Sequence, residues 1–89
     1  MQRQQRSKSE KVSDILRATH NCAGIRKSQI MYETCIPYIQ LKEYLSIMIQ
    51  NELITYIKEE RIFKITEYGM HLLEVYDEMD KLLVYNQIR

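Results

Sequence analysis

The spacing of hydrophobic positions changes several times along the chain, and each change marks an expected element. Val12, Ile15 and Leu16 recur at steps of three and four, which predicts a first helix over about residues 7–20. Ser7 and Glu10 have the spacing of a capping box, in which each side chain satisfies a free backbone N–H group of the first turn. The first element is therefore expected to be an amphipathic helix that begins near Ser7.

Two further helices are predicted between residues 27 and 50. A short one fits residues 27–35, whose apolar side chains fall on one side. Ile36 and Pro37 end it, because the residue before a proline avoids the helical conformation, and proline suits the first position of the next helix. The third helix is predicted over about residues 37–50, and its core-facing side is expected to hold Tyr38, Leu41, Leu45 and Met48.

Strand-forming residues replace the helical spacing after residue 52. Residues 53–57 and 62–65 are two β-rich runs joined by a charged four-residue turn, which predicts a hairpin. Thr66 is expected to cap a last helix over about residues 67–85. That helix carries a heptad seam made of Leu72, Tyr76, Met79 and Leu83. It is too apolar to stand alone in water, so part of it should pack on the domain and part on another surface.

Length and charge narrow the possible functions. The 89 residues suffice for one small domain, and the net charge of +1 names no partner. Residues 1–27 nevertheless carry seven basic side chains against two acidic ones, and residues 67–89 carry two against five. This asymmetry favours a basic end that faces a polyanion, although a chance distribution in a short chain is the alternative. No apolar run approaches a membrane span or a signal peptide, so we expect a cytoplasmic protein without membrane contact.

Metal binding and catalysis find little support. His20, Cys22 and Cys35 offer three zinc ligands, but the spacing of a four-ligand site is missing, and two reduced thiols are the preferred interpretation. The chain has no glycine-rich phosphate loop, no G-x-S-x-G and no histidine paired at useful spacing with cysteine or a carboxylate. We therefore expect no enzyme, no cofactor and no metal.

Two stretches of the chain resemble a known family. They are "SQIMYETCIPYIQLKEYLSIMIQNELI" and "KITEYGMHLLEVYDEMDKLL", which lie on either side of the predicted hairpin turn. The matching pieces are Ile30-Met31-Tyr32, Tyr38-x-Gln40-Leu41-Lys42-x-Tyr44-Leu45 and Thr66-Glu67-x-Gly69. Over about residues 7–85 the chain is similar to archaeal winged-helix DNA-binding proteins, among them ArnR-like transcriptional regulators and the ten-kilodalton archaeal DNA-binding proteins with a C-terminal coiled coil.

The resemblance implies a fold that is mainly α with a small β-hairpin wing, a winged helix-turn-helix plus a long C-terminal dimerisation helix. Residues 1–6 would be a flexible basic arm, residues 7–66 the winged helix-turn-helix and residues 67–89 the dimerisation helix. It also implies sequence-selective binding of double-stranded DNA as a homodimer, with a role in transcription regulation at the nucleoid. The third helix would enter the major groove, and the hairpin would be the wing.

The expected DNA contacts come from four segments. They are Lys27 and Ser28 at the start of the second helix; Tyr38, Ile39, Gln40, Lys42 and Glu43 on the third; Lys58, Arg61 and Lys64 on the wing; and Arg3, Arg6 and Lys8 near the N-terminus. Gln40 suits adenine, Lys42 suits guanine or a phosphate, and Glu43 suits cytosine. The dimer interface is expected at Leu72, Tyr76, Met79 and Leu83.

Three alternatives remain open at this point. The third helix and the wing carry nearly as many acids as bases, which predicts weak non-specific DNA binding and leaves room for a protein-interaction module that uses Ile39 and Ile47. Its partner would belong to the transcription machinery. Tyr38 is more readily explained as a core residue than as a DNA contact. A regulator that senses a small molecule is the third alternative, with Cys22, Cys35 or the tyrosines lining its pocket.

Overall fold

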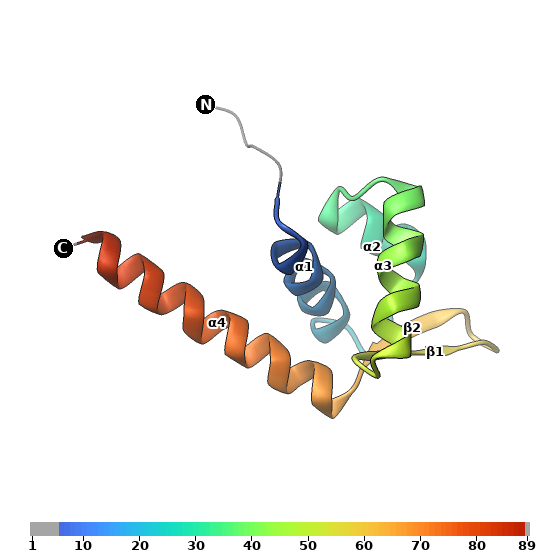
Figure 1. Ribbon diagram of the computed structural model, residues 1–89. Coiled ribbons are helices and arrows are strands. Elements are labelled where there is room, and N and C mark those ends of the chain that lie inside the picture. The colour runs from blue at the N-terminus through green and yellow to red at the C-terminus, as the bar shows by residue number, and fades with distance from the viewer. Residues whose placement is uncertain (1–5, 89) are drawn as a thin grey trace.

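Four helices and a β-hairpin make up the structure, a computed structural model that describes residues 6–88, with side chains to residue 83. In chain order the elements are α1 (Lys8–His20), α2 (Lys27–Thr34), α3 (Tyr38–Gln50), β1 (Ile54–Ile57), β2 (Ile62–Ile65) and α4 (Glu67–Ile88). Figure 1 shows α1, α2 and α3 gathered at one end of α4, with the hairpin projecting beside α3. The predicted order of elements is confirmed.

Local hydrogen bonds explain why α1 begins where it does. The Glu10 N–H group donates to Ser7 Oγ over 3.1 Å, and the Ser7 N–H group donates to Glu10 Oε1 over 2.8 Å. The predicted capping box is therefore confirmed. The helix that it opens buries Ile15 and Leu16 in the core.

Several predicted boundaries are wrong by one or a few residues. The short helix α2 ends at Thr34, because Cys35 turns into the left-handed conformation at φ 57°. Pro37 is the N-cap of α3 and not its first helical residue. Leu53 belongs to the turn before β1, and α4 continues to Ile88, past the predicted end near residue 85.

The core is formed where α1, α2, α3 and the start of α4 meet. Its buried hydrophobic residues are Ile15, Leu16, Ala18, Ile25, Ile30, Ile36, Leu41, Leu45, Met48, Leu53, Ile54, Phe63 and Leu73. Leu41, Leu45 and Met48 confirm the predicted core face of α3. The interpretation of Tyr38 as a core residue is wrong: its side chain is 48% exposed, because the first residue of α3 lies beyond the edge of this core.

The hairpin is fixed to the rest of the domain by a third short backbone pairing. Ile25, in the connection between α1 and α2, exchanges two hydrogen bonds with Phe63 of β2, at 3.1 and 2.8 Å. Tyr56 lies opposite Phe63 in the antiparallel register, and their ring centroids are 4.7 Å apart. The base of the hairpin is thereby held against the start of α2, while its turn projects outward (Figure 1).

The first turn of α4 is fixed against the end of α3. Thr66 caps the helix, since its Oγ1 accepts the Gly69 N–H group at 2.9 Å, as predicted, and its hydroxyl also contacts the Glu52 carbonyl oxygen at 2.7 Å. A Cβ atom on Gly69 would collide with the backbone carbonyl of Leu53. The absence of a side chain at Gly69 is therefore what lets α4 start this close to the domain.

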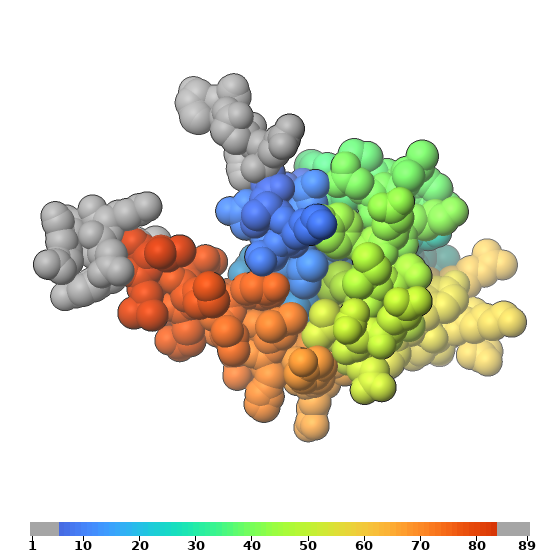
Figure 2. Space-filling model, in the orientation of Figure 1, coloured from blue at the N-terminus to red at the C-terminus, as the bar shows by residue number. Residues whose placement is uncertain are grey.

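The two halves of α4 have different surroundings. Leu73 of the first half is buried, and Asp77 pairs with Arg17 of α1 over 2.7 Å. Beyond this ion pair α4 diverges from α1, and Figure 2 shows its later turns, in red, extending away from the body of the domain.

Candidate nucleic-acid interface

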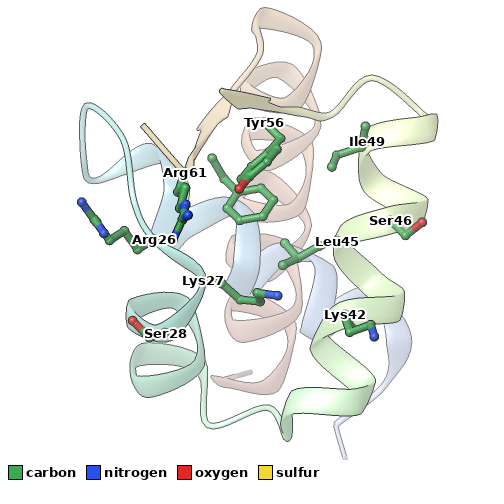
Figure 3. A pocket seen from close by; sticks show the side chains of 10 residues that line it. Arg26, Lys27, Ser28, Lys42, Leu45, Ser46, Ile49, Tyr56 and Arg61 are labelled. Carbon is green, nitrogen blue, oxygen red and sulfur yellow. The ribbon is translucent and has the colours of Figure 1, made fainter. Parts of the chain in front are cut away.

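A groove of about 670 Å³ lies between the start of α2, one side of α3 and the hairpin. We call it the basic groove. It is lined by Arg26, Lys27, Ser28, Lys42, Leu45, Ser46, Ile49, Tyr56, Arg61 and Phe63. Figure 3 shows Lys27, Leu45 and Tyr56 pointing into the space between α2, α3 and the hairpin, whereas the side chains of Arg26, Ser28 and Ser46 point away from its centre.

The charged groups of the basic groove are all cations. Arg26 is the N-cap of α2, Lys27 is its first residue, and Lys42 comes from the second turn of α3. Arg61 comes from the end of the hairpin turn, where its backbone has φ 57°. Among the described residues that line the groove, these four basic side chains face no carboxylate. Such a concentration of one sign of charge attracts a polyanion.

The floor of the basic groove is apolar and rigid. Leu45 and Phe63 belong to the buried core, and the Tyr56 ring packs on Phe63. The backbone bonds between Ile25 and Phe63 fix the hairpin against the start of α2, so the backbone positions from which the cations of the two elements extend are set by the fold. The groove is thus a preformed feature of the fold.

Tyr38 holds two of the lysines next to each other. Its ring centroid lies 4.9 Å from Lys27 Nζ and 5.8 Å from Lys42 Nζ. Both distances allow a cation–π attraction, which offsets part of the repulsion between the two ammonium groups. The exposed tyrosine therefore joins a cation of α2 to a cation of α3.

The solvent-facing side of α3 carries no basic side chain along its centre. Ile39, Glu43 and Ile47 follow one another at four-residue steps, and all three are exposed. Gln40 lies nearer to α1 and is half-buried, and its Oε1 accepts a hydrogen bond from Lys11 Nζ at 2.7 Å. The exposed side of α3 therefore extends from Gln40 to the basic groove.

The structure brings some of the predicted DNA contacts together and separates others. Lys27, Ser28, Lys42 and Arg61 line one groove, and Tyr38 joins two of them. Lys58, Lys64 and Lys8 are exposed outside that groove, and Lys64 points to the opposite face of the hairpin from Phe63. Arg6 is paired with Asp14 of α1 over 2.7 Å, and Arg3 lies outside the described residues.

Arg26 is the charged residue that sequence reasoning missed. It directly precedes Lys27, so the local signal was a basic pair at the start of a predicted helix. Tyr56 and Phe63 were also missed as groove residues, because no local pattern shows that the hairpin base approaches α3.

The predicted dimer residues also divide into two groups. Leu72 and Tyr76 are partly buried and pack against the core of their own domain. Met79 and Leu83 are exposed, and so are Val75 and Leu82, which the seam did not include. The described part of α4 therefore carries an uncovered apolar face after its first two turns.

The described residues form neither a metal-binding cluster nor a membrane-spanning helix. Among them, no three histidine, cysteine, aspartate or glutamate side chains gather closely enough to hold a metal ion. No described helix combines the length and the apolar character that crossing a membrane requires.

Comparison with known proteins agrees with this geometry. A family model described as winged helix-turn-helix matches residues 5–84. The structure is similar to the crystal structure of Sso10a-2, a DNA-binding protein from Sulfolobus solfataricus, with a TM-score of 0.76 and 25% sequence identity over 92% of this chain and 86% of that chain. No curated protein matches the chain. The predicted fold class and the resemblance to archaeal winged-helix proteins are confirmed.

Proposed function

The chain belongs to the winged helix-turn-helix family, and on that basis we propose that it binds double-stranded DNA as a homodimer and regulates transcription. The basic groove carries this proposal, because it places four cations from three segments beside the exposed face of α3. The similarity to Sso10a-2, described as a DNA-binding protein, supports it. A protein with this role acts at the nucleoid, so the proposal includes a cytoplasmic location.

In the proposed complex α3 enters the major groove and the hairpin follows the neighbouring backbone. A recognition helix reads bases mainly with its N-terminal residues, and here these are Ile39, Gln40 and Glu43, with Lys42 at the side toward the basic groove. Lys27, Lys42 and Arg61 then meet phosphates. Among the described side chains none caps α2, so its first N–H groups are also available to a phosphate oxygen.

The number of cations favours selective binding over general coating of DNA. Each phosphate neutralised adds about 0.9 to the slope of log affinity against log salt. Four groove cations therefore give a slope of about −3 to −4 for each protomer if all of them contact phosphates. Glu43, Glu59 and Glu60 on α3 and the hairpin turn oppose further non-specific attraction.

A second copy of the chain is the proposed partner of the exposed face of α4. Val75, Met79 and Leu82 follow helical spacing on that face, and Leu82 and Leu83 are 62% and 58% exposed. Association would remove these side chains from water, which is the main driving force for joining two such helices. Because Leu72 and Tyr76 already contact their own core, we place the centre of the interface at residues 75–83.

The deciding experiment measures DNA binding and mass in the same buffer. Fluorescence anisotropy with a random-sequence duplex at two salt concentrations should show affinity that falls steeply as salt rises, and light scattering should give the mass of a dimer. Absence of binding at the lower salt concentration would contradict DNA recognition. A monomer mass at the concentration of the assay would contradict dimerisation.

A protein-interaction module is the second candidate. Its support is the exposure of Ile39 and Ile47, at 73% and 53%, on the helix that would otherwise read DNA. A mainly apolar protein contact depends little on salt, whereas phosphate contacts depend on it strongly. The same titration therefore separates the two candidates.

A further inference from the structure

The outer side of α3 has a composition that phosphate binding does not explain. Ile39, Glu43 and Ile47 form a line along the helix at four-residue steps, which we call the outer ridge. It spans about 12 Å, because each helical residue advances the chain by about 1.5 Å. Its ends are apolar, and its middle is a carboxylate.

The charge of Glu43 determines which part of a DNA duplex this ridge fits. A carboxylate among phosphates is repelled, so the outer ridge is unsuited to lie along the sugar–phosphate backbone. The floor of the major groove instead offers the amino group of cytosine, which a carboxylate accepts from, and the 5-methyl group of thymine, which an apolar side chain contacts. Isoleucine and glutamate together match that floor.

The cations stand where this orientation needs them. Lys42 and the rest of the basic groove lie on one side of the ridge, toward α2 and the hairpin. When they meet the backbone, the ridge points into the groove. The cations of the basic groove thus position α3 through phosphate contacts, and the two isoleucines of the outer ridge distinguish bases.

We propose that the outer ridge recognises thymine methyl groups, with Ile39 as the principal contact and Ile47 as the second. This inference rests on the proposed DNA binding and names the sequence class that such binding selects. The two isoleucines are eight residues apart, so the thymines they contact lie about three to four base-pair steps from each other, given about 3.4 Å per step. Glu43 then faces the base pairs between them.

Replacement of thymine by uracil tests the proposal, since it removes only the 5-methyl group. The random-sequence duplex pool is made once with thymidine and once with deoxyuridine, and the affinity for each is measured by anisotropy. Burial of one methyl group corresponds to an affinity ratio of about three- to four-fold in favour of thymidine. Ile39→Ala should lower this ratio, leaving the smaller part that Ile47 contributes, while the salt slope stays unchanged.

Control variants keep the result interpretable. Tyr68→Ala removes another exposed apolar side chain, at the start of α4, and should retain the ratio. Ile39 is exposed, so circular dichroism should show the same melting for Ile39→Ala and wild type. Equal affinity for the two pools would overturn the inference and leave DNA binding standing. A ratio as large in Ile39→Ala as in wild type would overturn the assignment to the outer ridge, and absence of binding to both pools would overturn both proposals.

Discussion

The basic groove and the exposed face of α4 at residues 75–83 both carry apolar side chains, yet the two surfaces differ in how charged residues are arranged around them. In the groove Leu45 and Phe63 form a buried floor, Ile49 and Tyr56 are partly exposed beside it, and the charged residues around it are cations. On α4 the apolar residues project from the surface, and Glu74, Glu78 and Asp80 stand among them. The first arrangement attracts a polyanion, and the second repels one while it still favours contact with an apolar surface. The charge around the two surfaces therefore suits them to different kinds of partner.

The largest expected effect is on assembly through α4. Leu82→Asp would place a charge inside the proposed interface, where its desolvation is unfavourable, so the dimer should dissociate at least about 100-fold more readily. Lys81→Asp introduces the same side chain about 100° farther around the helix, at the edge of the exposed apolar face, and should weaken the dimer much less. Light scattering over a concentration series measures both. Equal masses for Leu82→Asp and wild type at every concentration would place the interface elsewhere.

The next largest effect is expected on stability, at the contact between Gly69 in the first turn of α4 and the Leu53 carbonyl. Gly69→Ala brings a methyl group against the rigid Leu53 carbonyl and should lower the free energy of unfolding by about 1–3 kcal/mol. At Gly24 the added methyl group meets the flexible end of the Ile62 side chain, so Gly24→Ala should cost less. Thermal unfolding of the two variants compares these effects. A larger loss at Gly24 would contradict the role given to the Leu53 carbonyl.

Removal of single charges should distinguish the groove from α4 directly. Lys27→Ala should weaken binding to random-sequence DNA about equally for all sequences and reduce the salt slope by about one unit. Lys81→Ala removes the same charge from α4 and should change neither quantity. A salt-titrated anisotropy assay measures both variants. Equal losses in the two would show that net charge, and not the groove, determines binding.

The smallest expected effect concerns the tyrosine beside the groove. Tyr38→Leu removes the ring that positions Lys27 and Lys42 and should weaken DNA binding by at most about two- to five-fold, the limit set by the free energy of an exposed cation–π contact. Tyr38→Phe keeps the ring and should bind like wild type. The same assay compares them, and a loss in Tyr38→Phe equal to that in Tyr38→Leu would assign the effect to the hydroxyl group.

The sequence predicted the elements well because their signals are local. Hydrophobic period, the Ser7–Glu10 capping box and the Thr66 cap all act within a few residues, and each is confirmed. The basic groove was not predicted as a unit, because it depends on a backbone pairing between Ile25 and Phe63, which are far apart in the chain. For the same reason the heptad spacing of α4 could not show which of its residues the domain itself covers.

The hydrogen bond between Lys11 and Gln40 has a consequence for selectivity. In the proposed complex Gln40 would give up this bond to pair with adenine and would keep it opposite any other base. When the base is not adenine, the Gln40 amide oxygen therefore keeps its hydrogen bond to Lys11 and is not left without a donor. Gln40 should therefore discriminate by less than the roughly 1–3 kcal/mol of an unengaged bidentate contact. The release of Lys11 would at the same time provide one more cation at the surface of α1.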